Sequence, residues 1–287
     1  MVEARHELPR SEHAGSRGRR VWRYRTVAPV VDTCAAAAQG RSSRKGRRCG
    51  GGALGCVGAR GTERTCADSA GHTGADLSGV VVEVGDGVED LAPDDAIFGV
   101  TNDRFVGAYA EFALADASRL ARRPAGLGFI EAGGMPVVAV TARSMLFDYG
   151  ELQSGQRVLV HGSAGAVGNL VVQLAHGAGA EVVATCRARD VAFVTKMGAD
   201  EVIDVEATDF VLAAKLVNLV IDTVGGETQR RSFDVIAPGG RLVSVVSPPD
   251  EALAAEARVQ AHYFIVDVRR PALSELGALF AAPGEHW

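Results

Sequence analysis

Three glycines at three-residue intervals follow a short apolar stretch near the middle of the chain. Residues 157–160 are predicted to form a buried strand, and Gly162, Gly165 and Gly168 come directly after it. Gly162 would permit a tight turn, Gly165 would let the backbone approach a pyrophosphate, and Gly168 would let a helix pack closely on the strand. The first N–H groups of that helix would face the phosphates. The spacing indicates a dinucleotide-binding turn.

The elements around the glycines count against a purely structural turn, because the motif needs a strand before it and a helix after it. The apolar residues after the turn repeat at helical spacing: Val167, Leu170, Val171, Leu174 and Ala175. We predict strands at 157–161, 181–186, 201–204, 218–222, 241–246 and 261–266, and helices near 166–177, 190–197, 208–216, 227–236 and 251–258. Such alternation predicts an α/β fold with a doubly wound parallel sheet.

Two arginines follow the second of these strands, where a site for NAD would carry an acidic residue. The sequence there reads Thr185-Cys-Arg-Ala-Arg189, with no carboxylate before Asp190. Guanidinium groups pair with phosphate in a bidentate manner, so Arg187 and Arg189 suit the 2′-phosphate of NADPH. A solvated loop is the alternative for both arginines. We favour NADPH as the cofactor.

Length and composition set the broad class of the protein. With 287 residues, 47% of them apolar and 23% charged, the chain has the composition of a soluble globular protein of two domains. It has no run of about 18 apolar residues, so no membrane span is expected. No secretory signal is visible, which favours the cytoplasm. We expect neither a membrane nor a nucleic-acid partner.

The first part of the chain differs from the rest in charge. Residues 1–75 hold 14 Arg and Lys against 6 Asp and Glu, whereas the remainder holds 16 against 29. We expect residues 1–73 to be an atypical basic segment that is disordered, because it shows no lasting hydrophobic period, or that comes from a shifted reading frame. Only 3 of the 30 basic residues are Lys, as in a GC-rich gene.

Two other interpretations of this segment stay open. Clustered arginines could neutralise the phosphates of a nucleic acid. Cys49, Cys56, Cys66 and His72 could hold zinc, but their spacing matches no short-loop zinc pattern. We therefore predict no metal.

From residue 74 the sequence takes on the pattern of an ordinary fold. We expect strands at 77–84, 94–99 and 107–113, and helices at 129–133, 137–149 and 271–280. The second of these helices follows Pro136, which interrupts the first.

Six stretches together resemble the zinc-independent quinone oxidoreductase branch, related to zeta-crystallin, of the medium-chain dehydrogenases/reductases. The resemblance covers about residues 74–275. The stretches, in the order found in that family, are Gly74-Ala-Asp-Leu-Ser-Gly-Val-Val-Val-Glu-Val-Gly85, Gly107-Ala-Tyr-Ala-Glu-Phe112, Val137-Val-Ala-Val-Thr-Ala142, His161-Gly-Ser-Ala-Gly-Ala-Val-Gly168, Gly198-Ala-Asp-Glu-Val-Ile-Asp204 and Ile221-Asp-Thr-Val-Gly-Gly226.

The resemblance implies two domains with the active site in the cleft between them. Residues 74–145 would form part of a GroES-like β-barrel domain, and residues 146–287 would form a Rossmann domain that binds NADPH. The metal-contacting Gly-His-Glu triplet of the zinc-dependent branch is replaced by Gly74-Ala75-Asp76, so a catalytic zinc is not expected. The expected activity is hydride transfer to a quinone or an α,β-unsaturated carbonyl.

The same resemblance implies roles for particular residues. Tyr109 could orient a substrate carbonyl as the one catalytic candidate, although a packed tyrosine is the alternative. Val245, Val246 and Ile265 are implied to lie beside the nicotinamide, but they could equally belong to buried strands. The implied cofactor contacts are Thr141 near the nicotinamide and its phosphate, Ser163, Ala164, Gly165, Ala166 and Val167 along the pyrophosphate, Cys186 and Arg189 at the 2′-phosphate, and Val245, Val246, Phe264, Ile265 and Val266 beside the nicotinamide.

Two segments of the family are not recognisable, one before residue 74 and one after about residue 280. The barrel domain is therefore expected to be incomplete at both ends. This leaves two alternatives to the quinone reductase. One is an enoyl reductase that acts on a thioester, and the other is a nucleotide-binding protein without turnover. A homodimer is an expectation from the family.

Overall fold

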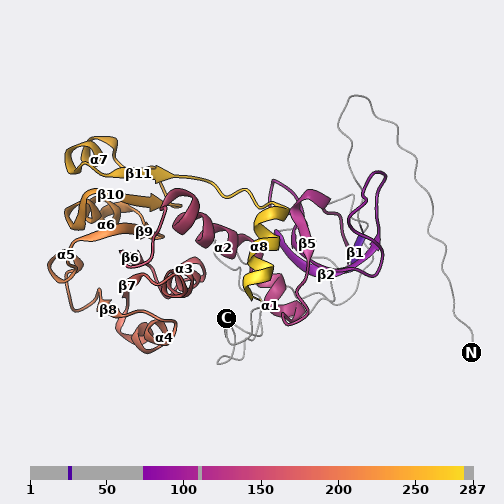
Figure 1. Ribbon diagram of the computed structural model, residues 1–287, viewed down its shortest axis with the longest axis horizontal. Helices are drawn as coiled ribbons and strands as arrows, with labels where there is room; N and C mark the ends of the chain where they lie inside the picture. The colour runs from indigo at the N-terminus through magenta and orange to yellow at the C-terminus, as the bar shows by residue number, and fades with distance from the viewer. Residues whose placement is uncertain (1–24, 28–73, 109–111, 281–287) are drawn as a thin grey trace, which may run out of the picture.

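A computed structural model describes residues 25–27, 74–108 and 112–280, and this part of the chain contains two sheets (Figure 1). A larger sheet with its helices forms one half, and a smaller sheet forms the other. Helices α2 (Pro136–Arg143) and α8 (Arg270–Phe280) lie between the two halves. None of the described helices is long and apolar enough to cross a membrane.

The larger sheet has six parallel strands in the order β11-β10-β9-β6-β7-β8. The order reverses between β6 and β9, which is where doubly wound folds bind their ligands. The predicted doubly wound parallel sheet is thus confirmed. The strands are β6 (Arg157–His161), β7 (Glu181–Cys186), β8 (Glu201–Asp204), β9 (Val217–Asp222), β10 (Ile236–Ser244) and β11 (Gln260–Tyr263).

The central strands are apolar throughout because both faces of the sheet are covered. On β6, Val158 and Val160 belong to one buried cluster and Leu159 to another, and all three are fully buried. The covering helices are α3 (Ala166–Gly177), α4 (Val191–Lys196), α5 (Phe210–Ala213), α6 (Gly226–Ser232) and α7 (Glu251–Ala257). The helix predicted over 208–216 is much shorter than expected.

Two strand predictions for the larger sheet were wrong at their ends. Strand β10 starts at Ile236 rather than residue 241, because an irregular register around Gly239 and Gly240 lets the strand begin earlier. Strands β10 and β11 end together, at the paired residues Ser244 and Tyr263. Residues 245–246 and 264–266 therefore lie beyond the strands instead of inside them.

The smaller sheet is antiparallel and runs in the order β4-β1-β2-β3-β5. Leu77, Val81, Ile97 and Leu120 form the centre of its buried cluster. Its strands are β1 (Arg25–Val27), β2 (Asp76–Glu83), β3 (Ala96–Val100), β4 (Phe112–Ala113) and β5 (Leu120–Arg122). Apart from β1, residues 1–73 lie outside the described residues, as do the predictions made for them.

The helices next to the smaller sheet are α1 (Phe129–Gly134), α2 and α8. The helix predicted over 137–149 begins as α2 and continues as a π-helix, η3 (Ser144–Tyr149). Helix α8 packs on β5 and α2. The last described helix thus packs on the smaller sheet, although residues 146–287 were all predicted to belong to the Rossmann domain.

Candidate functional site

The glycine turn has the geometry that its spacing indicates. Gly162 has φ of +71°, a backbone conformation that side chains disfavour. A Cβ on Gly168 would lie 2.2 Å from the carbonyl oxygen of Gly162, so only glycine lets α3 pack this closely on the turn. Gly165 is the N-cap residue of α3.

The N-terminus of α3 is open toward solvent. No side chain caps the helix, and its first turn carries no acidic residue. Gly165 and Ala166 are exposed, while Ala164 and Val167 are half-buried. Backbone N–H groups at such a helix end suit a phosphate. This cradle therefore fits the pyrophosphate of a dinucleotide.

The Ser163 side chain holds the turn in place. Ser163 is fully buried, and its hydroxyl donates a 2.9 Å hydrogen bond to the carbonyl oxygen of Thr185 on β7. Its hydroxyl is thus turned into the protein. The backbone N–H of Ser163 donates to the same carbonyl oxygen at 3.3 Å, so both hydrogen-bond donors of Ser163 are used within the protein.

His161, which was not among the predicted site residues, lies buried at the end of β6, immediately before the turn. Its Nδ1 is 3.0 Å from the Thr185 hydroxyl oxygen, and its Nε2 is 3.1 Å from that of Ser232. Burial lowers the pKa of His161 to about 4, against a smaller opposing effect of Asp222. The ring is neutral at physiological pH and ties β6 to β7 and α6.

The predicted 2′-phosphate residues lie at the end of β7 and just after it, and they differ in exposure. The Arg187 and Arg189 side chains are 59% and 72% exposed, and each has only a loose ion pair, with Glu206 at 3.9 Å and Asp190 at 3.5 Å. Cys186 is buried, and burial raises the pKa of its thiol, helped by Asp190 and Asp204. The two arginines are free to turn toward a phosphate.

Asp222 organises the loops at the other side of the switch point. Its fully buried carboxylate accepts hydrogen bonds from the N–H groups of Val224 and Gly225, and also from the side chains of Gln229 and Ser244. Asp222 is therefore a loop-capping residue. It ties the loop after β9 to the end of β10.

These loops leave apolar side chains in contact with solvent at the carboxyl edge of the sheet. Val224, Val246 and Ile265 are 50%, 47% and 77% exposed, and Val245, Phe264 and Val266 are half-buried. The alternative that Val245, Val246 and Ile265 belong to buried strands is wrong, because the strands end before them. Val224 was not among the predicted contacts, although it lies within the stretch 221–226 that resembles the family.

The remaining candidates lie in the smaller half and in α2. Thr141 is buried, and its hydroxyl donates a 2.7 Å hydrogen bond to the carbonyl oxygen of Val137 one turn earlier in α2. Tyr109 lies outside the described residues, so its predicted role stays a prediction. Asp76 on β2, which was not predicted as a site residue, accepts a 2.9 Å hydrogen bond from the N–H of Val137.

The described residues do not fit a zinc ion. Within residues 74–108 and 112–280, no group of three or more His, Cys, Asp or Glu side chains could hold a metal. The triplet at 74–76 has no histidine. Cys49, Cys56, Cys66 and His72 lie outside the described residues.

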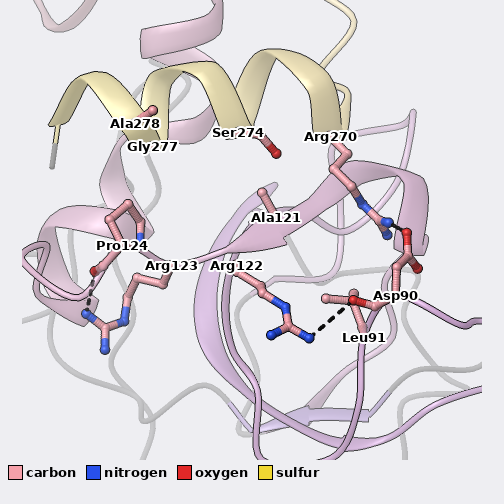
Figure 2. Close-up of a pocket in the computed structure, with 10 residues that line it drawn as sticks. All are labelled: Asp90, Leu91, Ala121, Arg122, Arg123, Pro124, Arg270, Ser274, Gly277 and Ala278. Carbon is pink, nitrogen blue, oxygen red and sulfur yellow. Dashed lines mark hydrogen bonds and ion pairs between the residues drawn. The ribbon is translucent and has the colours of Figure 1, made fainter.

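A cavity of about 500 Å³ lies elsewhere, between β5 and α8 (Figure 2). Arg122, Arg123 and Arg270 line it, and all three have partners. Arg122 pairs with Asp95, Arg270 pairs with Asp90, and Arg123 donates to the carbonyl oxygen of Pro124. The cavity is separate from the glycine turn and from the carboxyl edge of the larger sheet.

The fold and the turn together define a dinucleotide-fold protein of the dehydrogenase class, and the comparisons narrow this class. Residues 166–268 match the family model of the zinc-binding dehydrogenases. The zebrafish mitochondrial NAD(P)H oxidoreductase RTN4IP1 is 31% identical over 184 residues, which are 61% of this chain and 48% of that protein. The chain thus spans about half of this curated relative.

Two solved quinone oxidoreductases are similar over most of the chain. That of Coxiella burnetii is 31% identical, with a TM-score of 0.68, over 73% of this chain and 67% of its own. That of Escherichia coli, solved in complex with NADPH, is 26% identical, with a TM-score of 0.67, over 73% and 70%. The chain belongs to the medium-chain dehydrogenases/reductases and is quinone oxidoreductase-like. The smaller sheet is its GroES-like part.

Proposed function

We propose that this chain binds NADPH and delivers its hydride to a quinone or an α,β-unsaturated carbonyl, without a metal. One observation carries the proposal. The open cradle at Gly165, the two exposed arginines after β7 and the exposed apolar residues after β9, β10 and β11 all follow the carboxyl ends of neighbouring strands. Phosphate, 2′-phosphate and nicotinamide would each meet a surface of matching chemistry along this edge.

The phosphate side of the cofactor would rest on backbone and guanidinium groups. The N–H groups at the start of α3 would hold the pyrophosphate, and Gly168 keeps this helix close to the turn. Arg189 and Arg187 would bind the 2′-phosphate, since their ion pairs are long and solvent-exposed. A carboxylate that would favour NADH is absent between Thr185 and Arg189.

The nicotinamide side would rest on apolar groups. Val224, Val246 and Ile265 would cover the ring and exclude water around the reacting carbon. Bound NADPH supplies a hydride from its ring C4. The Asp222 and Ser244 side chains fix the loops of Val224 and Val246, so this wall is formed before the cofactor arrives.

Among the described residues of this edge, none is placed to supply the proton that the acceptor takes up after hydride transfer, so solvent would supply it. The nitrogens of His161 lie within hydrogen-bond distance of two hydroxyls, and both carboxylate oxygens of Asp222 accept hydrogen bonds. A conjugated acceptor suits this arrangement, because hydride adds to its carbon and water can protonate the oxygen that becomes negative. The main contribution of the protein would be orientation.

The first test is a titration of the protein with NADPH and with NADH, followed by nicotinamide fluorescence. We expect tighter binding of NADPH, and we expect Arg189→Ser to weaken NADPH binding about 10-fold or more while NADH binding is unchanged. Arg122→Ser is the control, because Arg122 is similarly exposed at 65% and lies on β5. Equal binding of both cofactors by the unaltered protein would remove the NADPH assignment.

The second test compares acceptors with NADPH present. Oxidation of NADPH by a benzoquinone or a simple enone supports the proposal. A reaction confined to enoyl thioesters would favour the enoyl reductase, and binding without oxidation of any acceptor would favour a nucleotide-binding protein.

A further inference from the structure

The connection between β11 and α8 spans residues 264–269. It leaves the larger sheet and crosses to the smaller one (Figure 1). Its first three residues, Phe264–Val266, are those proposed to lie beside the nicotinamide. Their position therefore depends on what holds each end of this connection.

Its first end is held by an aromatic contact. The ring of Phe264 stacks on that of Tyr149, with centroids 4.4 Å apart and planes inclined by 15°. Tyr149 is the last residue of the π-helix η3, which continues α2. A π-helical turn is rare and often occurs at functional sites.

Its second end is held by an arginine that lies just before a strand of the smaller sheet. Arg119 precedes β5 and is 4% exposed. Its Nη1 donates a 2.7 Å hydrogen bond to Oδ1 of Asp267 and a 3.0 Å hydrogen bond to the carbonyl oxygen of Val268. Two acceptors on successive residues fix both the place and the orientation of this peptide.

Neighbouring arginines strengthen the same attachment. Arg269 donates from Nε to the other oxygen of Asp267 at 2.8 Å. Arg270 donates from Nε to the carbonyl oxygen of Leu120 at 2.8 Å and also pairs with Asp90 (Figure 2). Residues 267–270 are thus attached to the edge of the smaller sheet, and Ile265, 77% exposed, lies between the two ends.

The burial of Arg119 is not explained by stability alone. A guanidinium loses its hydration when it is buried, and an apolar residue of similar size often stabilises a fold as well or better. The partner carboxylate of Asp267 is 57% exposed, which weakens the attraction further. Unlike an apolar contact, the hydrogen-bonded pair of Arg119 and Asp267 fixes the direction of the chain just after Val266.

We propose that Arg119 and Asp267 are positioning residues that hold Phe264–Val266 against the nicotinamide, so that the smaller sheet sets the wall at the reacting carbon. This inference rests on the proposed function. The GroES-like half would then act on the cofactor through the hydrogen bonds of Arg119, which lies 148 residues before Asp267 in the sequence.

The test uses the full chain with Asp267→Asn, which keeps the side-chain shape but removes its charge, and Asp267→Glu as the conservative variant. Three quantities are measured: the NADPH dissociation constant, kcat with the primary isotope effect of C4-deuterated NADPH, and hydrogen exchange of the amides of 264–268. We expect the dissociation constant to change less than about 3-fold, and kcat to fall about 10-fold with a larger isotope effect. Amide exchange should rise, and Asp267→Glu should recover part of kcat.

Arg122→Gln is the matched control, because it breaks an ion pair of the same sheet without touching the connection. We expect kcat and exchange to stay as in the unaltered protein. If Asp267→Asn matches the unaltered protein in kcat, isotope effect and exchange, the positioning role is wrong while the proposed function stands. If the unaltered protein does not bind NADPH, the proposed function itself fails, and the positioning role fails with it.

Discussion

The Asp76 carboxylate on β2 accepts a 2.9 Å hydrogen bond from the backbone N–H of Val137, in the first turn of α2. The carbonyl of the same Val137 accepts the hydroxyl of Thr141. Through its N–H and its carbonyl group, Val137 thus joins the smaller sheet to the residue implied to approach the nicotinamide. Burial raises the pKa of Asp76 to about 7, although the hydrogen bond from Val137 opposes the increase.

This pKa predicts that stability falls as pH rises. Between the unfolded pKa of 3.8 and the folded value of about 7, the folded protein holds a proton that the unfolded chain has lost. The stabilisation is complete below the lower value and is lost as pH rises through the higher one, at about 1.4 kcal/mol per pH unit. We expect Asp76→Asn to lack this loss, measured as the free energy of unfolding in urea from pH 5 to pH 8. Parallel profiles for the variant and the unaltered protein would contradict the assignment.

The lowered pKa of His161 predicts the opposite dependence of stability on pH. Its folded pKa of about 4 lies below the unfolded value of 6.5, so the unfolded chain takes up the proton first as pH falls. Its contribution is present above pH 6.5 and is lost toward pH 4, again at about 1.4 kcal/mol per unit. We expect the stability difference between the unaltered protein and His161→Gln to shrink from pH 7 to pH 5.

A second measurement separates titration of His161 from lost packing. The ring-proton NMR signals of His161 should stay at their neutral positions down to about pH 5, because the ring is buried between Thr185 and Ser232. A midpoint near pH 6.5 would mean that the ring is not buried in solution. Above pH 6.5, Asp76 should be the only one of these two groups that still changes the free energy of unfolding with pH.

The sequence predicts the centre of the site well, because the determinants there are local. Strand 157–161 and helix 166–177 are found at the predicted residues. The glycines in between are required by backbone conformation and by close contacts within a few residues. Short-range spacing carries this information without knowledge of the rest of the chain.

What could not be predicted depends on distant partners. The ends of β10 and β11 are set by their mutual pairing, and this decides that Val246 and Ile265 are exposed. The hydroxyl of Ser163 points away from the cofactor cradle because Thr185 on the next strand offers a carbonyl. The contact of Arg119 with Asp267 joins two halves of the fold, and no spacing in the sequence indicates it.

The exposed apolar edge predicts a loss of turnover without a loss of stability. Ile265→Ser removes an apolar side chain from the proposed nicotinamide wall, so we expect kcat/KM for NADPH to fall about 10-fold, or about 1.4 kcal/mol. Stability should stay within about 0.5 kcal/mol, because Ile265 is 77% exposed. Leu212→Ser is the matched control, since Leu212 is 86% exposed and lies on α5. If both substitutions change kcat/KM equally, Ile265 does not belong to the nicotinamide wall.

The close packing of α3 on the glycine turn gives a further matched pair of substitutions. Gly168→Ala places a methyl group 2.2 Å from the carbonyl oxygen of Gly162, so the helix or the turn must move. We expect a loss of about 1–3 kcal/mol in the free energy of unfolding. We also expect at least about 10-fold weaker NADPH binding, because the N–H groups at the helix start no longer point at the pyrophosphate.

Gly177→Ala tests the same change at the other end of α3. Apart from its chain neighbours and the backbone of its own helix, no atom lies within 4 Å of its Cβ position, so the added methyl group meets open space. Alanine is the better helix former, and we expect stability to rise by up to about 1 kcal/mol with NADPH binding unchanged. Urea unfolding and nicotinamide fluorescence measure both quantities in both variants. If Gly168→Ala binds NADPH as tightly as Gly177→Ala does, then the close contact at the turn is not what shapes the cofactor site.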